Sequence, residues 1–98
     1  MTLRVVFRQA AKSEFEDAAA WYDARHAGLG EEFSVEMEQA VMNAAVALRR
    51  YPVVFGDVRR AVTRRFPFSI FFRVRKDDLI VLAVFHGRRN PVAWLRRV

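Results

Sequence analysis

The spacing of apolar residues along the chain predicts two helices. Apolar side chains recur at intervals of three and four between about residues 10 and 26, and again between about residues 31 and 50. The first set is Phe15, Ala18, Ala19 and Tyr22, and the second is Phe33, Met37, Ala40, Val41, Ala44 and Leu48. Pro52 is expected to end the second helix. Only residues 28–30 separate the two segments, so we expect an antiparallel helical hairpin.

The rest of the chain has the two-residue period of strands. Short runs rich in β-branched and aromatic residues predict strands at residues 3–7, 58–65, 68–75 and 79–85. The last run is apolar on both faces, which is typical of a strand inside a sheet. Short connections predict that the last three strands form an antiparallel meander.

The order β-α-α-β-β-β predicts one α+β domain over residues 1–98. The helical hairpin would pack on one face of a mainly antiparallel sheet, giving two layers. No repeat, linker or low-complexity tract indicates a second domain. A hydrophobic fraction of 53%, with nine Phe, favours a folded globule over disorder.

Charge divides the chain into two unlike halves. Residues 56–98 hold eleven basic and three acidic residues, a net of +8, whereas residues 1–55 hold six basic and eight acidic residues, a net of −2. Such separation concentrates positive potential on one part of the surface. It indicates a polyanionic partner, either nucleic acid or an acidic protein segment.

Several classes of chemistry lack the residues they require. There is no cysteine, which excludes thiol chemistry and disulfides. The two distant histidines make none of the usual metal-ligand spacings, and no glycine-rich phosphate loop is present. No apolar run is long enough to span a membrane, and no secretion signal precedes the first charges. We therefore expect a cytoplasmic protein with no metal, no cofactor and no membrane partner.

The residues that remain for chemistry are arginines and one histidine. Arginine suits bidentate contacts to phosphate. His86 is the one plausible general acid or base near the cationic segment, although a structural or hydrogen-bonding role is the alternative. Phe71 is unusual, because it shares its predicted face with Ser69 and Arg73; it would meet either a partner or the second side of the sheet.

The chain resembles the RelE/ParE superfamily of toxins from bacterial type II toxin–antitoxin systems, also called plasmid stabilisation proteins. The resemblance covers nearly the whole chain, and its pieces occur in order. They are AAAWY (residues 18–22), GLGEEF (28–33), YP (51–52), VRR (58–60), RFPFSI (65–70), FRV (72–74), VLAV (81–84) and HGRRNP (86–91).

The resemblance implies growth inhibition that a cognate antitoxin holds in check. RelE-like members of the superfamily cut messenger RNA on the ribosome without a metal, whereas ParE-like members poison DNA gyrase. For RNA cleavage, Arg60 or Arg59 would replace the basic residues of the second strand, and Arg88 matches the arginine after the last strand. The third-strand arginine of the cleaving members falls at Ser69, however, and their C-terminal tyrosine falls at Trp94. These two departures favour the ParE-like activity.

The resemblance leaves three functions to compare: a ParE-like gyrase inhibitor first, a RelE-like messenger RNA endoribonuclease second, and a non-toxic antitoxin-binding module third. For the endoribonuclease, the catalytic residues would be Arg60, His86 and Arg88. The expected contacts to nucleic acid or antitoxin are Arg59, Arg64, Arg65, Arg73, Arg89 and Trp94. The antitoxin would dock through an acidic C-terminal segment that is disordered until it binds, forming a hetero-oligomeric complex. The alternative for these arginines is a solvated charge that protects a sheet edge from aggregation.

Overall fold

A computed structural model describes residues 2–89 and 95–97 of the chain. Its elements follow the predicted order, with an additional strand and a short 3₁₀ helix after the second helix, and residues 95–97 form a further 3₁₀ turn. In chain order they are β1 (Arg4–Phe7), α1 (Gln9–Arg25), α2 (Leu29–Val46), η1 (Leu48–Arg50), β2 (Val53–Phe55), β3 (Val58–Val62), β4 (Phe68–Arg75) and β5 (Asp78–His86).

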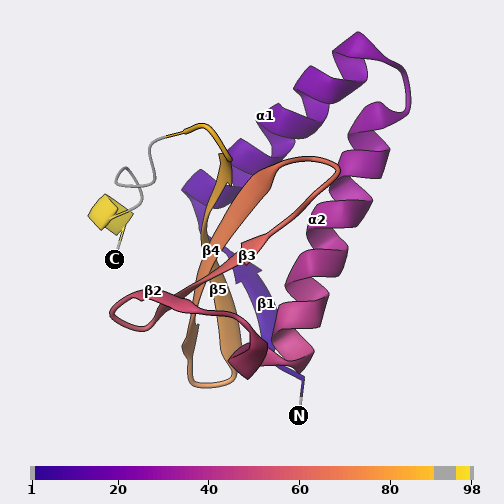
Figure 1. The fold of residues 1–98 in the computed structure, drawn as a ribbon. Coiled ribbons are helices and arrows are strands. Elements are labelled where there is room, and N and C mark those ends of the chain that lie inside the picture. Colours follow the sequence, from indigo (N-terminus) through magenta and orange to yellow (C-terminus); the bar gives the residue numbers. More distant parts are fainter. Residues whose placement is uncertain (1, 90–94, 98) are drawn as a thin grey trace.

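The two long helices lie together on one face of a five-stranded sheet (Figure 1). The strand order is β1-β5-β4-β3-β2. β1 runs parallel to β5, and every other pair is antiparallel. The prediction of an α+β fold with a helical hairpin on a mainly antiparallel sheet is therefore confirmed. β5 is also interior, as its apolar character on both faces predicted, because β1 and β4 flank it.

The turn of the helical hairpin depends on Asp23 and two glycines. Asp23 Oδ1 accepts the backbone N–H of Gly28 at 2.9 Å and that of Gly30 at 3.2 Å. Gly28 has a φ of 89°, a region that other residues rarely adopt. Because these contacts cap the helix, α2 begins at Leu29, two residues before the predicted start.

The second helix also ends earlier than the sequence predicts. Regular α-helix stops at Val46, because Ala47 leaves helical geometry with φ −132° and ψ 55°. The chain continues as the 3₁₀ turn η1, whose Leu48 still packs against the core. The apolar period thus continues past the end of the helix. A prediction based on this period therefore overestimated the length of the second helix.

One strand was not predicted, and another ends earlier than predicted. β2 was not predicted, because its three residues lie between Pro52 and Gly56 and are too few to show a period. β3 ends at Val62 instead of at residue 65. The Thr63 hydroxyl donates to the Phe66 carbonyl and accepts from the backbone N–H of Phe68, which closes the turn into β4. Arg64 and Arg65 consequently lie in a connection and not in a strand.

Apolar residues cover both faces of the sheet. The larger cluster joins the helices to the sheet and includes Phe33, Met37, Phe72 and Val81, each 1% exposed or less. A smaller cluster on the opposite face consists of Val58, Phe71, Leu82, Ala83 and Phe85, with Leu95 packed against it. Phe71 therefore packs on the second side of the sheet, one of the two positions expected for it.

Candidate functional site

The strand register places Arg60 and His86, two of the three predicted catalytic residues, on opposite faces of the sheet. Arg60 pairs with Phe71, which belongs to the cluster on the face away from the helices. Phe68 pairs with His86, and Phe68 packs on the helix side. Directly opposite residues of an antiparallel pair share a face. The Arg60 side chain and the His86 imidazole consequently leave the sheet in opposite directions.

The His86 ring is held on the helix side by an aromatic contact. It packs edge-on against Phe68, with ring centroids 5.3 Å apart. Its Nδ1 atom accepts the backbone N–H of Arg88 at 3.1 Å. This is the hydrogen-bonding role that the sequence left open for His86.

Five of the described arginines in residues 56–98 are bound to carboxylates. Arg73 donates to Asp57 from Nε at 3.1 Å and from Nη2 at 2.7 Å, and Arg75 donates to the other oxygen of the same carboxylate. These hydrogen bonds, first from Arg73 and then from Arg75, lower the pKa of Asp57 from 3.8 to about 2. Arg65 pairs with Glu32 at 2.6 Å. Arg89 and Arg97 both pair with one carboxylate of α1.

That carboxylate belongs to Glu14, which joins α1, β5 and the C-terminal segment. Glu14 accepts the backbone N–H of Val84 at 3.0 Å, beyond the point where β1 stops pairing with β5. The same carboxylate accepts from Arg89 at 3.0 Å and twice from Arg97 at 2.9 Å. Sequence reasoning missed this site, because 70 to 83 residues separate Glu14 from its partners.

Other arginines carry a positive charge that no carboxylate of the described residues neutralises. Of the arginines predicted as site residues, Arg60, Arg64 and Arg88 are exposed and form no ion pair with another described residue. Arg59 leaves the opposite face from Arg60 and donates to the Tyr51 carbonyl at 2.6 Å. The predicted contact at Trp94 lies outside the described residues.

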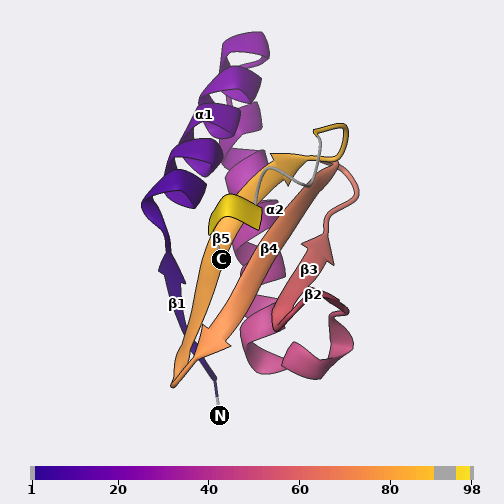
Figure 2. The ribbon, with the colours of Figure 1, turned by 90° about the vertical axis from the view of Figure 1, so that its left-hand side faces the viewer.

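Arg60, Arg64 and Arg88 lie toward one end of the sheet. The connection after β3, the start of β4 and the end of β5 meet there (Figures 1 and 2). Gly87 donates its N–H to the Pro67 carbonyl at 2.7 Å, tying these segments together. We call this end of the sheet the rim. A small hollow of about 60 Å³ opens beside it, lined by Arg60, Ser69, Phe71, Phe85, His86, Gly87 and Arg89.

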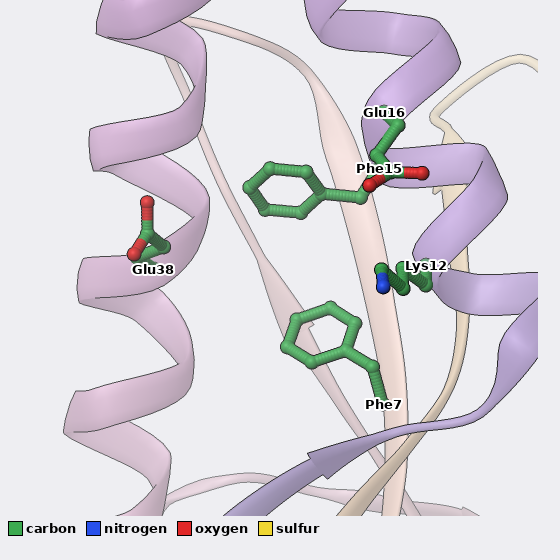
Figure 3. Close-up of a pocket in the computed structure, with 5 residues that line it drawn as sticks. All are labelled: Phe7, Lys12, Phe15, Glu16 and Glu38. Atoms are coloured by element: carbon green, nitrogen blue, oxygen red, sulfur yellow. The ribbon is translucent and has the colours of Figure 1, made fainter.

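Two apolar hollows were not predicted. One, of about 270 Å³, lies at the rim between α1 and the end of β5. The other, of about 340 Å³, lies between the two helices, where Phe7 and Phe15 project into the space between Glu38 on α2 and Lys12 and Glu16 on α1 (Figure 3). Both form between segments distant in sequence, so no local pattern reveals them.

The described part of the chain offers no cluster of three or more metal-binding side chains. Within the same residues, no helix combines the length and the apolarity needed to cross a bilayer. The chemistry available at the rim is therefore that of guanidinium groups, one imidazole and aromatic rings.

Comparison with known proteins identifies the class. A family model described as the ParE toxin of the type II toxin–antitoxin system parDE matches residues 5–91. Among solved structures, the fold is similar to a chain of the chromosomal ParDE TA system from P. aeruginosa. The TM-score is 0.74 at 16% identity, over 87% of this chain and 96% of that one. No curated protein matches the sequence.

The family match spans nearly the whole chain, and the chain belongs to the ParE toxin family. It is a ParE-like toxin of a type II toxin–antitoxin system, a class in which each toxin is paired with a cognate antitoxin. The predicted place in the RelE/ParE superfamily is thereby confirmed.

Proposed function

We propose that the chain arrests growth in the cytoplasm by inhibiting DNA gyrase. The observation that supports this choice over RNA cleavage is that the His86 imidazole and the Arg60 side chain leave opposite faces of the sheet, although both residues border the small hollow at the rim. Metal-free cleavage needs an acid or base and a cation around the same phosphate. His86 instead packs on Phe68 on the helix side, while Arg60 projects from the other face.

A second observation weakens the ribonuclease alternative. Ser69, where the cleaving relatives are expected to carry an arginine, is half-buried and lines the hollow beside Arg60. A hydroxyl there adds no positive charge for a pentacovalent phosphate. Arg60, His86 and Arg88 remain the residues to mutate if RNA cleavage is found.

We also propose that the cognate antitoxin neutralises the toxin through an acidic C-terminal segment that is disordered before binding. The support is the excess of arginines over carboxylates in residues 56–98, together with Arg60, Arg64 and Arg88, which are exposed and form no ion pair with another described residue. Ordering of such a segment on the toxin would give a hetero-oligomeric complex.

The first test is to induce the chain without an antitoxin and to follow labelled thymidine and methionine incorporation over the next minutes. Gyrase inhibition predicts that thymidine incorporation falls first, because replication forks stall before protein synthesis fails. If methionine incorporation falls first, messenger RNA cleavage replaces the proposal. If neither falls, the chain is a non-toxic antitoxin-binding module.

A direct assay then tests the target. Purified chain should reduce DNA supercoiling by purified gyrase in a dose-dependent manner. The matched control is Phe33→Asp, which puts a charge among buried aromatic rings and abolishes the fold. Full gyrase activity in the presence of the folded chain would overturn the proposal.

A further inference from the structure

The outer face of α2 carries a row of exposed apolar side chains. Val35, Met42 and Val46 are 60%, 52% and 68% exposed. They lie seven and four residues apart, so they occupy one stripe along the helix. This stripe is on the side of α2 away from the buried residues Phe33 and Met37. In Figure 1, α2 forms the right-hand side of the molecule, with the sheet to its left.

The two ends of this stripe carry opposite charge. At the N-terminal end, a hollow of about 390 Å³ is lined by Glu31, Glu32, Val35, Glu36 and Arg65. Glu32 pairs with Arg65, so the other two glutamates leave an excess of negative charge there. At the C-terminal end, Arg49 and Arg50 are exposed in η1 and form no ion pair with another described residue. The acidic end of one copy therefore matches the basic end of a second copy.

We propose that two copies of this chain associate through the outer faces of their α2 helices, which run antiparallel in the dimer. A twofold axis between Gln39 and Met42 brings Val35 of one copy against Val46 of the other. The arginines that follow α2 in each copy then reach the acidic hollow of its partner. A surface that carries its own complement in this way fits a second copy of the same chain.

The charges at the two ends require the antiparallel direction. Parallel helices would place Glu31 beside the same residue of the second copy and Arg50 beside its own counterpart, so like charges would repel at both ends. Antiparallel helices place each acidic end beside a basic end, and the two helix dipoles then oppose each other favourably. The positions on the outer face alternate in steps of three and four, the spacing with which two helices pack along a seam. They are Glu32, Val35, Gln39, Met42, Val46 and Arg49.

The length of α2 limits the strength of this contact. Its 18 residues span about 27 Å. A contact between two helices of this length lies at the small end of specific interfaces, so we expect a reversible dimer with a Kd of about 10 µM. The inference does not depend on gyrase inhibition, because the association involves this chain alone.

Sedimentation velocity of the chain, made by cell-free synthesis, tests the proposal over about 1 to 100 µM. The sedimentation coefficient should rise with concentration toward that of a dimer. Met42→Glu should weaken the association at least about tenfold, because it puts a carboxylate at the centre of the seam. The control is Val62→Glu, which changes a similarly exposed side chain on β3 and should leave the association unchanged. A chain that stays monomeric throughout, or equal effects of the two variants, would overturn the proposal.

Charge reversal tests the antiparallel direction. One variant combines Glu31→Arg with Glu32→Arg, and a second combines Arg49→Glu with Arg50→Glu, all at exposed positions where changes should leave the fold intact. Each variant alone should associate at least about tenfold more weakly than the natural chain, because like charges then meet at both ends. An equimolar mixture of the two variants should associate about as tightly as the natural chain, since every end again faces opposite charge. A mixture that associates no more tightly than either variant alone would overturn the antiparallel seam.

Discussion

At the scale of single residues, Asp57 determines how much of the cationic sheet is free to bind. One carboxylate engages both Arg75 and the predicted contact residue Arg73, so both guanidinium groups are already partnered. Arg73 is only 15% exposed in its side chain, and its charge is largely taken up within the molecule. Counting arginines therefore overstates the binding surface.

The low pKa of Asp57 gives a pH-dependent prediction. Folding lowers this pKa from 3.8 to about 2, so the ion pairs stabilise the fold above pH 4, and this contribution is lost as pH falls toward 2. Asp57→Asn should lower the free energy of unfolding at pH 6 by about 0.5–1 kcal/mol, a discounted value because the group is half-exposed. Urea unfolding at pH 6 and at pH 2.5 measures the effect.

The difference between the two proteins should shrink at the lower pH, because Asp57 is then becoming protonated in the natural chain too. Asp77→Asn, at an exposed turn position, is the control and should change little at either pH. A difference that grows on acidification would contradict the assigned ion pairs.

At the scale of elements, the close approach of α1 and α2 depends on Gly30. A Cβ atom at this position would overlap the Ala19 carbonyl oxygen and lie 3.0 Å from the Asp23 Cβ. The helices can cross this closely only because residue 30 has no side chain. The same approach brings Asp23 within reach of the N-terminus of α2.

Gly30→Ala should therefore destabilise the protein by about 1–3 kcal/mol, as overpacking does elsewhere. The control is Gly28→Ala, where φ is 89° but nothing lies within 4 Å of an added Cβ. That change should cost about 1 kcal/mol through backbone strain alone. Thermal unfolding of both variants measures the difference. Equal losses would show that the backbone, and not the helix contact, decides the effect.

At the scale of the whole molecule, one aromatic cluster holds the two layers together. The Phe33 ring, fully buried on α2, lies 5.3 Å from the Tyr22 ring on α1 and 5.0 Å from the Phe68 ring on β4. It also meets Phe15 at 5.7 Å and Phe66 at 5.6 Å. Tyr22 also lines the apolar hollow between α1 and the end of β5, so the core and this hollow share a wall.

Phe33→Ala should cost about 3–5 kcal/mol, because it removes a buried ring and leaves a cavity between the layers. The matched control is Val35→Ala on the same helix, whose side chain is 60% exposed and should matter little. Chemical unfolding at neutral pH gives both values. A loss for Phe33→Ala no larger than that for Val35→Ala would refute the role of this cluster.

The sequence by itself determined the elements and the division of charge. Helices and strands differ in their apolar period, and this period follows from local backbone geometry, so the long helices and four of the five strands could be predicted from nearby residues. The order β-α-α-β-β-β then limited the layers to a helical hairpin on a sheet. The same local information placed the positive charge in residues 56–98.

Only the tertiary structure decided the parallel pairing of β1 with β5, the existence of β2 and the exposure of each arginine. These features depend on contacts between distant residues, such as Glu14 with Arg97 and Asp57 with Arg73. Arg59 and Arg60 are neighbours in sequence, yet alternation along a strand sends them to opposite faces. Which charges remain for a partner is thus fixed by the packing of the folded chain, since a nearby carboxylate neutralises one arginine and leaves the next one free.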